Sequence, residues 1–346
     1  MYKYFIDSAI VTIAGITAVY FWGEHINPGS GLMAIFIASI LAILEISLSF
    51  DNAVVNAMKL EKMSEIWQKR FLTWGIAIAV FGMRFLFPIL IVSIFSHLDM
   101  VSVTNMAIGN SKEYEKYLQL THAPILTFGG TFLIMLFLNY FFNNEKKIHW
   151  IEPIEKPLST MDNFRGIEII ITLIIIIILQ NFIQMEEKIS VILAGIAGII
   201  TYLSIEGVSS FLEKREESRL SKCTSNTIKC SGLISFLYLE LIDASFSLDG
   251  VLGAFALSND IIIISIGLGI GAMFVRSLTL VIVKTKTLAK FIYLEHGAHW
   301  AIGALAIVML ISTVKSVPEV VTGLIGFVLI ISSLISSIKY NRLEKK

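Results

Sequence analysis

Two polar stretches with the same pattern lie inside hydrophobic runs of this chain. Residues 45–52 read Glu-Ile-Ser-Leu-Ser-Phe-Asp-Asn, and residues 243–250 read Asp-Ala-Ser-Phe-Ser-Leu-Asp-Gly. Both stretches place an acid, two serines and a second acid at the same spacing. Carboxylates inside membrane segments are costly, and they occur mostly along the paths of ions, protons or substrates. The repeated pattern therefore indicates one polar site to which both stretches contribute.

The polar side chains of these two runs define the chemistry that such a site would support. The first run offers Glu45, Ser47, Ser49, Asp51 and Asn52, and the second offers Glu240, Asp243, Ser245, Ser247 and Asp249. All of them present oxygen atoms, and neither run contains Cys or His. Oxygen sets suit hard cations such as Mg²⁺, Ca²⁺ and Mn²⁺. The excess of negative charge favours a divalent cation over an anion.

The spacing of the acids also constrains the helices that carry them. Glu45 and Asp51 are six residues apart, so on a regular helix they differ in direction by roughly 120°. One straight helix would not aim both at the same ion. Either two antiparallel helices contribute together, or each helix is locally unwound and frees backbone carbonyls as further ligands.

Two intramembrane arginines offer a structural alternative to an ion site. Arg84 and Arg276 each lie inside a hydrophobic run and could neutralise the acids as buried ion pairs. Two arginines cannot neutralise five acids, so about three negative charges would remain for ions or protons. We therefore favour a cation site, with the arginines positioning the acids or supplying positive charge while the site is empty.

A second titratable cluster is formed by Glu295, His296 and His299. Glu295 and His299 are four residues apart and share one face of a helix. A histidine titrates near neutral pH and so could relay protons. An interfacial cap at a helix N-terminus explains the same residues equally well, and both interpretations stay open.

The composition predicts the elements that position these residues. Hydrophobic residues make up 55% of the 346 residues and charged residues 16%, values that are typical of a polytopic membrane protein. Runs of about 20 apolar residues can span a bilayer, and we expect an all-α bundle of ten such spans. Their approximate limits are 4–22, 32–58, 71–95, 123–142, 167–184, 189–212, 232–258, 261–283, 296–314 and 318–338.

Several functional classes find no support in the sequence. The net charge is zero, so no basic surface is expected to recruit nucleic acid. We find no phosphate loop, nucleotide fingerprint or nucleophile elbow, and we expect neither an enzyme nor a resident cofactor. Cys223 and Cys230 have no nearby His and are expected to be free thiols rather than a zinc site. The first run lacks the features of a cleavable signal peptide.

The basic residues predict the orientation. Lys and Arg cluster in loops 59–70, 143–166, 213–231, 284–290 and 339–346. The other loops, 23–31, 96–122, 185–188, 259–260 and 315–317, hold only Lys112, Lys116, Lys188 and Lys315. Basic and non-basic loops thus alternate along the chain, as ten spans and the positive-inside rule require. We expect a multi-pass protein of the cytoplasmic (inner) membrane with both termini in the cytoplasm.

The duplicated pattern predicts an inverted repeat within a single transporter domain, residues 1–346. The acidic stretches lie on spans two and seven, which cross the membrane in opposite directions. We expect spans 2–4 (residues 32–142) and spans 7–9 (residues 232–314) to be related by a pseudo-two-fold axis. Residues 143–231 would be a linker with accessory spans five and six, and residues 315–346 the last span and a cytoplasmic tail.

At these residues the sequence resembles the TerC family of integral membrane proteins, within a wider LysE-like cation-exporter superfamily. The match lies in the stretches around Glu45–Asn52 and Glu240–Gly250 and continues through the arginine-bearing spans. Gly250 stands where many relatives have Ser, which together with the Ile-rich spans five and six indicates a divergent branch. The resemblance implies manganese export and a metal site formed by Glu45, Asp51, Asn52, Glu240, Asp243 and Asp249.

The expected function is export of a divalent cation, Mn²⁺ foremost, by a secondary transporter. Counter-flow of protons, sodium or another cation would drive the export, and the expected partners are the bilayer and these ions, with no nucleic acid. Two rivals remain: a membrane scaffold of the tellurium-resistance type that docks soluble proteins on its cytoplasmic loops, and the same fold carrying Ca²⁺ or another cation.

Overall fold

The computed structural model describes residues 2–344, apart from 62, 97, 145, 147, 164–165, 186, 221–235, 238, 241–253, 255–256, 259, 287–290 and 316. All regular elements in this part are helices, in agreement with the predicted all-α class. They are η1 (Tyr2–Phe5), α1 (Ile6–Ile26), α2 (Gly31–Leu48), α3 (Phe50–Glu61), α4 (Glu65–Ala77), η2 (Ile78–Leu86), α5 (Phe87–Ser96), α6 (Met100–Gly109), α7 (Ser111–Leu120), α8 (His122–Phe142), α9 (Glu152–Ser159), η3 (Thr160–Asn163), α10 (Ile167–Leu179), η4 (Gln180–Phe182), α11 (Lys188–Leu220), α13 (Ile261–Lys284), α15 (Leu294–Ser312) and α16 (Glu319–Glu344).

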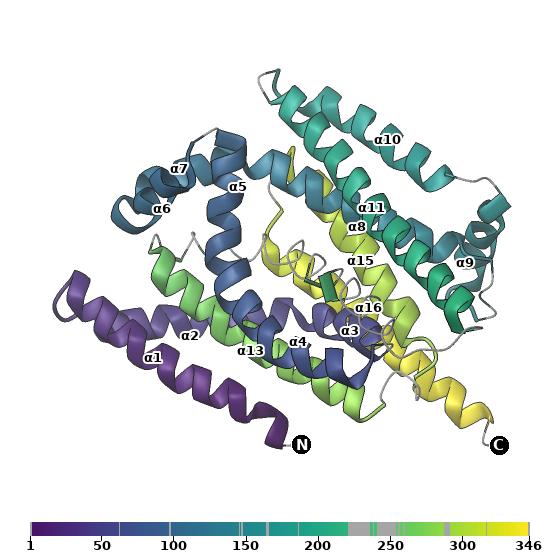
Figure 1. Ribbon diagram of the computed structural model, residues 1–346, viewed down its shortest axis with the longest axis horizontal. Helices are drawn as coiled ribbons and strands as arrows, with labels where there is room; N and C mark the ends of the chain where they lie inside the picture. Colours follow the sequence, from purple (N-terminus) through teal and green to yellow (C-terminus); the bar gives the residue numbers. More distant parts are fainter. Residues whose placement is uncertain are drawn as a thin grey trace.

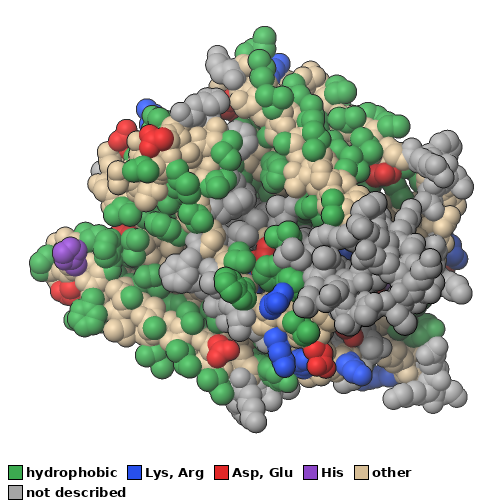
Figure 2. Space-filling model, in the orientation of Figure 1, with side chains coloured by type: hydrophobic (Ala, Val, Ile, Leu, Met, Phe, Trp, Pro, Cys, Tyr) green, Lys and Arg blue, Asp and Glu red, His purple; other side chains and the backbone are tan. Residues whose placement is uncertain are grey.

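Six helices in the described part are long and apolar enough to cross a membrane: α1, α8, α11, α13, α15 and α16. Large apolar side chains on them are widely exposed, for example Ile13 at 70% and Ile189 at 72%. Figure 2 shows hydrophobic side chains spread over much of one face of the molecule. Monomeric soluble proteins rarely expose apolar surface on this scale. The chain is therefore a membrane protein.

The other predicted spans correspond to less regular segments. Span 71–95 is divided among α4, η2 and α5, and span 167–184 is the short α10 followed by η4. Most of span 232–258 lies outside the described residues. The ten-span count therefore stays a prediction.

The predicted span 32–58 is a broken helix. α2 ends at Leu48, α3 begins at Phe50, and the axes of the two helices differ by 57°. The break falls within the first acidic stretch, between Glu45 and Asn52. Helical hydrogen bonds continue across the bend, from Ser49 N–H to the Glu45 carbonyl at 2.9 Å and from Ala53 N–H to the Ser49 carbonyl at 3.3 Å, so polar groups gather where a hydrogen-bonded backbone changes direction.

α13 packs closely against α2 through its glycines. A Cβ atom on Gly267 would lie 2.9 Å from the Ala38 carbonyl oxygen, and one on Gly271 would lie 2.4 Å from the Glu45 Cβ atom. Side chains at these positions would separate the helices, so glycine allows the backbones to approach. This approach holds Glu45 against the helix that carries Arg276.

The helices form two groups. Figure 1 shows α1, α2 and α13 together on one side of the molecule and α10 and α11 on the other. α8 packs against both α11 and α15, and α15 also contacts α3 and α16. The predicted outer segment 96–122 folds into α6 and α7, whose Val103 and Leu118 are buried in a cluster with Leu268 of α13.

Candidate functional site

Glu45 lies in the last turn of α2 and is 4% exposed. Its Oε1 atom accepts hydrogen bonds from Arg84 Nη2 at 2.5 Å and from the Ser49 hydroxyl at 3.0 Å. Among the described residues no group donates to its other oxygen, Oε2. The buried carboxylate therefore has a counter-charge, and one of its oxygens can still accept a ligand.

Arg84 comes from a distorted part of the chain. It lies in η2, a π-helical stretch between α4 and α5, and π-helical turns are rare and often occur at functional sites. Pro88 has no backbone N–H and cannot donate to the Arg84 carbonyl four residues earlier. Ser265 of α13 donates its hydroxyl hydrogen to that carbonyl at 3.0 Å. The distorted turn is thus tied to α13.

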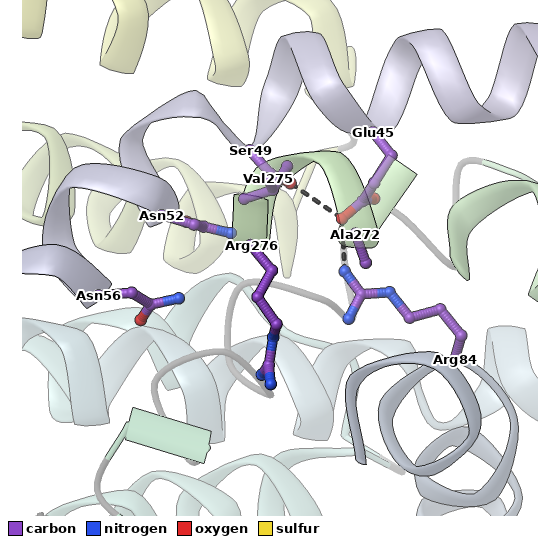
Figure 3. A pocket seen from close by; sticks show the side chains of 8 residues that line it. All are labelled: Glu45, Ser49, Asn52, Asn56, Arg84, Ala272, Val275 and Arg276. Carbon is purple, nitrogen blue, oxygen red and sulfur yellow. Dashed lines mark hydrogen bonds and ion pairs between the residues drawn. The ribbon is translucent and has the colours of Figure 1, made fainter. Parts of the chain in front are cut away.

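These residues line a small cavity of about 10 Å³, which is room for roughly one water molecule. The lining residues are Glu45, Ser49, Asn52, Asn56, Arg84, Ala272, Val275 and Arg276. Figure 3 shows that they come from both sides of the α2–α3 break, from η2 and from α13. The cavity therefore lies where the broken helix meets α13.

Asn56 is the polar residue of the cavity lining that sequence reasoning missed. It is 4% exposed, and its Oδ1 atom is buried without a hydrogen-bond partner in the described part of the chain. Such an atom costs free energy unless a ligand or water satisfies it. The available signal was its position four residues after Asn52 in an apolar helix, which places both amides on one face.

Arg276 points away from the Glu45–Arg84 pair, as Figure 3 shows. Its Nη2 atom lies 3.3 Å from Oε1 of Glu240. Its Nη1 donates to the Phe71 carbonyl at 2.5 Å, and the guanidinium lies over the Phe71 ring at 4.0 Å. A Cβ atom on Gly75 would lie 1.8 Å from Nη1, so glycine at that position leaves the space that the guanidinium occupies.

The structure gathers part of the predicted site. Glu45, Ser49, Asn52, Arg84 and Arg276 line the cavity, and Glu240 is held by Arg276. Ser47 is exposed and donates to the carbonyl of Ile43 in its own helix, so the structure does not bring it to the cavity. The Asp51 side chain and residues Asp243, Ser245, Ser247 and Asp249 lie outside what the structure describes.

The second predicted cluster lies elsewhere, at the first turns of α15. His299 stacks on the ring of Tyr140 at 3.4 Å, and its Nδ1 atom is 2.8 Å from the Glu295 carbonyl oxygen. His296 contacts Glu155, a buried acid of α9 that sequence reasoning missed. No local pattern marks Glu155, because it lies between two prolines in a segment with the composition of a linker.

The described residues present only part of a cation site. They contain no group of three or more His, Cys, Asp or Glu side chains that could hold a metal ion. They do offer Oε2 of Glu45 and Oδ1 of Asn56, and carboxylate and carbonyl oxygens are the ligands that hard divalent cations prefer. These donor types would suit a hard cation, which would require further ligands beyond these two atoms.

Comparison with known proteins identifies a family. No match was found among curated proteins or among solved structures. A family model described as "Protein of unknown function (DUF475)" matches residues 50–344. This range runs from α3, at the helix break, through α16, and it covers most of the chain. The chain therefore belongs to the DUF475 family.

Proposed function

We propose that this chain is a secondary transporter that moves a divalent cation, with Mn²⁺ as the first candidate, out of the cytoplasm. The observation that carries the proposal is the cavity at the helix break, which is lined by Asn56, whose buried Oδ1 atom lacks a donor in the described part of the chain, and by Glu45, whose described hydrogen bonds all go to Oε1. A dehydrated divalent ion is small enough for a cavity of about 10 Å³. Broken helices at such sites are typical of secondary transporters.

The charge balance supports a cation rather than an anion as cargo. Arg84 pairs with Glu45, and Arg276 pairs with Glu240. This leaves three acids of the repeated pattern, Asp51, Asp243 and Asp249, to provide negative charge. In the proposed metal site these aspartates join Glu45, Asn52 and Glu240, and Asn56 adds an amide oxygen.

The arginines have a specific role in this proposal. Arg84 is the counter-charge of Glu45 in the cation-free site, which makes burial of the carboxylate tolerable. An entering dication would compete with Arg84 for Glu45, so binding and release of the ion would move the guanidinium. The dication replaces Arg84 as the counter-charge of Glu45 when it binds, and Arg84 returns when the ion leaves. The buried Glu45 carboxylate therefore has a positive partner in both the loaded and the empty state.

The proposal includes the ten spans and the inverted repeat with the domain limits given above. One further correspondence supports the repeat: Gly75 and Arg84 are nine residues apart, and so are Gly267 and Arg276. The resemblance to the TerC family and the alternation of basic loops support export with both termini in the cytoplasm. Export of a dication against about 100 mV costs about 4.6 kcal/mol, so a proton, sodium or another cation must flow inward.

Transport by charge-neutralised variants tests the proposal. In proteoliposomes that contain purified protein, we expect wild type to move Mn²⁺, whereas Asp51→Asn and Asp249→Asn abolish transport without preventing insertion. Glu152→Gln changes an exposed acid on α9 and serves as the control, with transport retained. Normal Mn²⁺ transport by both aspartate variants would refute the proposed site.

Two additional measurements distinguish this proposal from its rivals, which are transport of another cation and a membrane scaffold. Thermal stabilisation by Mn²⁺, Ca²⁺, Mg²⁺ and Zn²⁺ identifies the preferred cargo, because an ion that binds only the folded protein raises the unfolding temperature. For a scaffold, deletion of residues 213–231 would impair manganese tolerance in cells more than Asp51→Asn does. For the transporter we expect the opposite order.

A further inference from the structure

Glu155 is a second buried carboxylate, far from the cavity in sequence and only 1% exposed. Its Oε1 atom accepts a hydrogen bond from Trp300 Nε1 at 2.9 Å, and its Oε2 atom accepts one from the Trp150 backbone N–H at 2.9 Å. His296 Nδ1 lies 2.9 Å from the same Oε2 atom, and His149 Nδ1 lies 3.8 Å from it. Nitrogen groups thus surround both oxygens.

These contacts fasten the segment after α8 across the ends of two spanning helices. Glu155 belongs to α9, whereas His296 and Trp300 belong to the first turns of α15. The rings of Trp300 and Phe141, in the last turn of α8, lie 5.0 Å apart. Lys146 lies over the Tyr140 ring and donates to the Tyr140 carbonyl. One short segment therefore bridges α8 and α15.

The strength of this fastening depends on the charge of Glu155. Burial alone would raise the pKa of Glu155, but its contacts with His296 and Trp300 outweigh burial and lower the pKa to about 2. The side chain is thus a carboxylate at all physiological pH values. α9 has only eight residues and contains Pro157, so the helix itself contributes little to holding the segment in place.

The fastened ends lie beyond the cavity along α3. α3 carries Asn52 and Asn56 at the cavity, and Lys59 follows about 4.5 Å further along the axis. α15 packs against α3. Movement of the first turns of α15 would therefore separate it from the part of α3 that leads to the cavity.

We propose that the contacts of Glu155 with Trp300 and His296 hold α9 across α8 and α15 and close this end of the helix bundle. We call this arrangement the latch. Release of Glu155 from Trp300 and His296 lets α15 move away from α3 and opens a path toward the cavity. The opening step rests on the proposed function, whereas the latch itself does not. Among the described residues, the titratable or charged groups around Glu155 are Tyr140, His149 and His296, and those around the neighbouring Tyr140 and His299 are Lys59, Lys146 and Glu295.

Hydrogen exchange and thiol labelling of purified protein test the two parts of the proposal. Glu155→Gln keeps the shape of the side chain and removes its charge. We expect amide exchange in residues 148–160 to accelerate at least tenfold, the equivalent of about 1.4 kcal/mol. Glu152→Gln on the same helix is the control, because Glu152 is exposed and, in the described part of the chain, pairs with Lys156 on the same helix. Exchange in this variant should equal that of wild type.

Thiol labelling tests whether release of Glu155 opens a path to the cavity. In a background with Cys223→Ser and Cys230→Ser, Val275→Cys places a thiol in the cavity lining. Glu155→Gln should increase alkylation of this thiol by a water-soluble maleimide at least tenfold, and Glu152→Gln should not. Trp300→Phe removes one donor while the carboxylate stays charged, so it should give a smaller increase in both measurements and serves if Glu155→Gln fails to fold.

The outcomes separate the latch from the transport proposal. Unchanged exchange in both Glu155→Gln and Trp300→Phe overturns the latch, whatever the wild type transports. Faster exchange with unchanged alkylation overturns the opening of the cavity. Faster exchange and faster alkylation support both parts, even if no tested metal ion is transported.

Discussion

Glu45 and Glu155 are both buried carboxylates, yet their surroundings differ. Glu45 depends on a single guanidinium and one hydroxyl, both directed at Oε1, beside a cavity. Glu155 has nitrogen groups at both oxygens. A carboxylate with an oxygen that has no donor can bind an ion. A carboxylate whose two oxygens both accept hydrogen bonds serves to connect the segments that supply the donors. The difference indicates that Glu45 is suited to binding a cation and that Glu155 is suited to attaching α9 to α15.

Removal of Arg84 should give the largest effect and tests whether Glu45 relies on one counter-charge. Arg84→Met leaves a buried carboxylate without compensation, and we expect a loss of about 3–5 kcal/mol in the free energy of unfolding. Denaturant unfolding in detergent measures it. Trp300→Phe, which removes one of several donors from Glu155, should cost about 1.5–3 kcal/mol.

The double variant Arg84→Met with Glu45→Gln is the control for this prediction. Removing the carboxylate charge should recover part of the lost stability, because the two groups interact directly. If Arg84→Met costs no more than Trp300→Phe, or if the double variant recovers nothing, the contrast between the two carboxylates fails.

Acid should weaken the Glu155 contacts in a defined pH range. The pKa of Glu155 in the folded protein is about 2, below the ordinary value of 4.5, so the ionised form stabilises the fold. This contribution is complete above pH 4.5 and is lost as the pH falls toward 2. The measurement is the unfolding temperature of wild type minus that of Glu155→Gln at decreasing pH. The gap should narrow over this range; a constant gap would contradict the assignment.

The two serines of the first acidic stretch should differ in their effect on stability. Ser49→Ala removes a hydrogen bond to the Glu45 carboxylate and should cost about 1.5 kcal/mol. Ser47→Ala removes only a bond to the helix's own backbone, and we expect a change within about 0.5 kcal/mol. Equal unfolding free energies for the two variants would show that Ser49 does not support Glu45.

Asn56 should give the smallest effect, with the opposite sign. Its buried Oδ1 atom lacks a donor among the described residues, so Asn56→Leu should stabilise the protein by about 1 kcal/mol. The same change should weaken stabilisation by Mn²⁺, since a cavity ligand is lost. Thermal unfolding with and without Mn²⁺ measures both. Lower stability of the ion-free variant would mean that Asn56 has a structural partner instead.

The sequence was sufficient for the class of fold and for part of the site. Apolar runs predict helices in a membrane because only internally bonded backbones are stable there. The acid spacing around Glu45 and Asp51 raised a local break as one alternative, and the structure has one at Ser49. The first polar run also contains Asn52, and the two intramembrane arginines were singled out as possible partners of the acids; all three line the cavity.

The partners of these residues follow from tertiary structure alone. Arg84 is 39 residues from Glu45, and Trp300 is 145 residues from Glu155. Local periodicity does not predict pairs that are so far apart in the sequence, because helix packing decides which distant side chains meet. Thus the sequence by itself determined that charges are buried in apolar helices, since composition and spacing fix helicity and hydrophobicity. Packing decided which charges are paired, which are saturated, and which oxygens face a cavity.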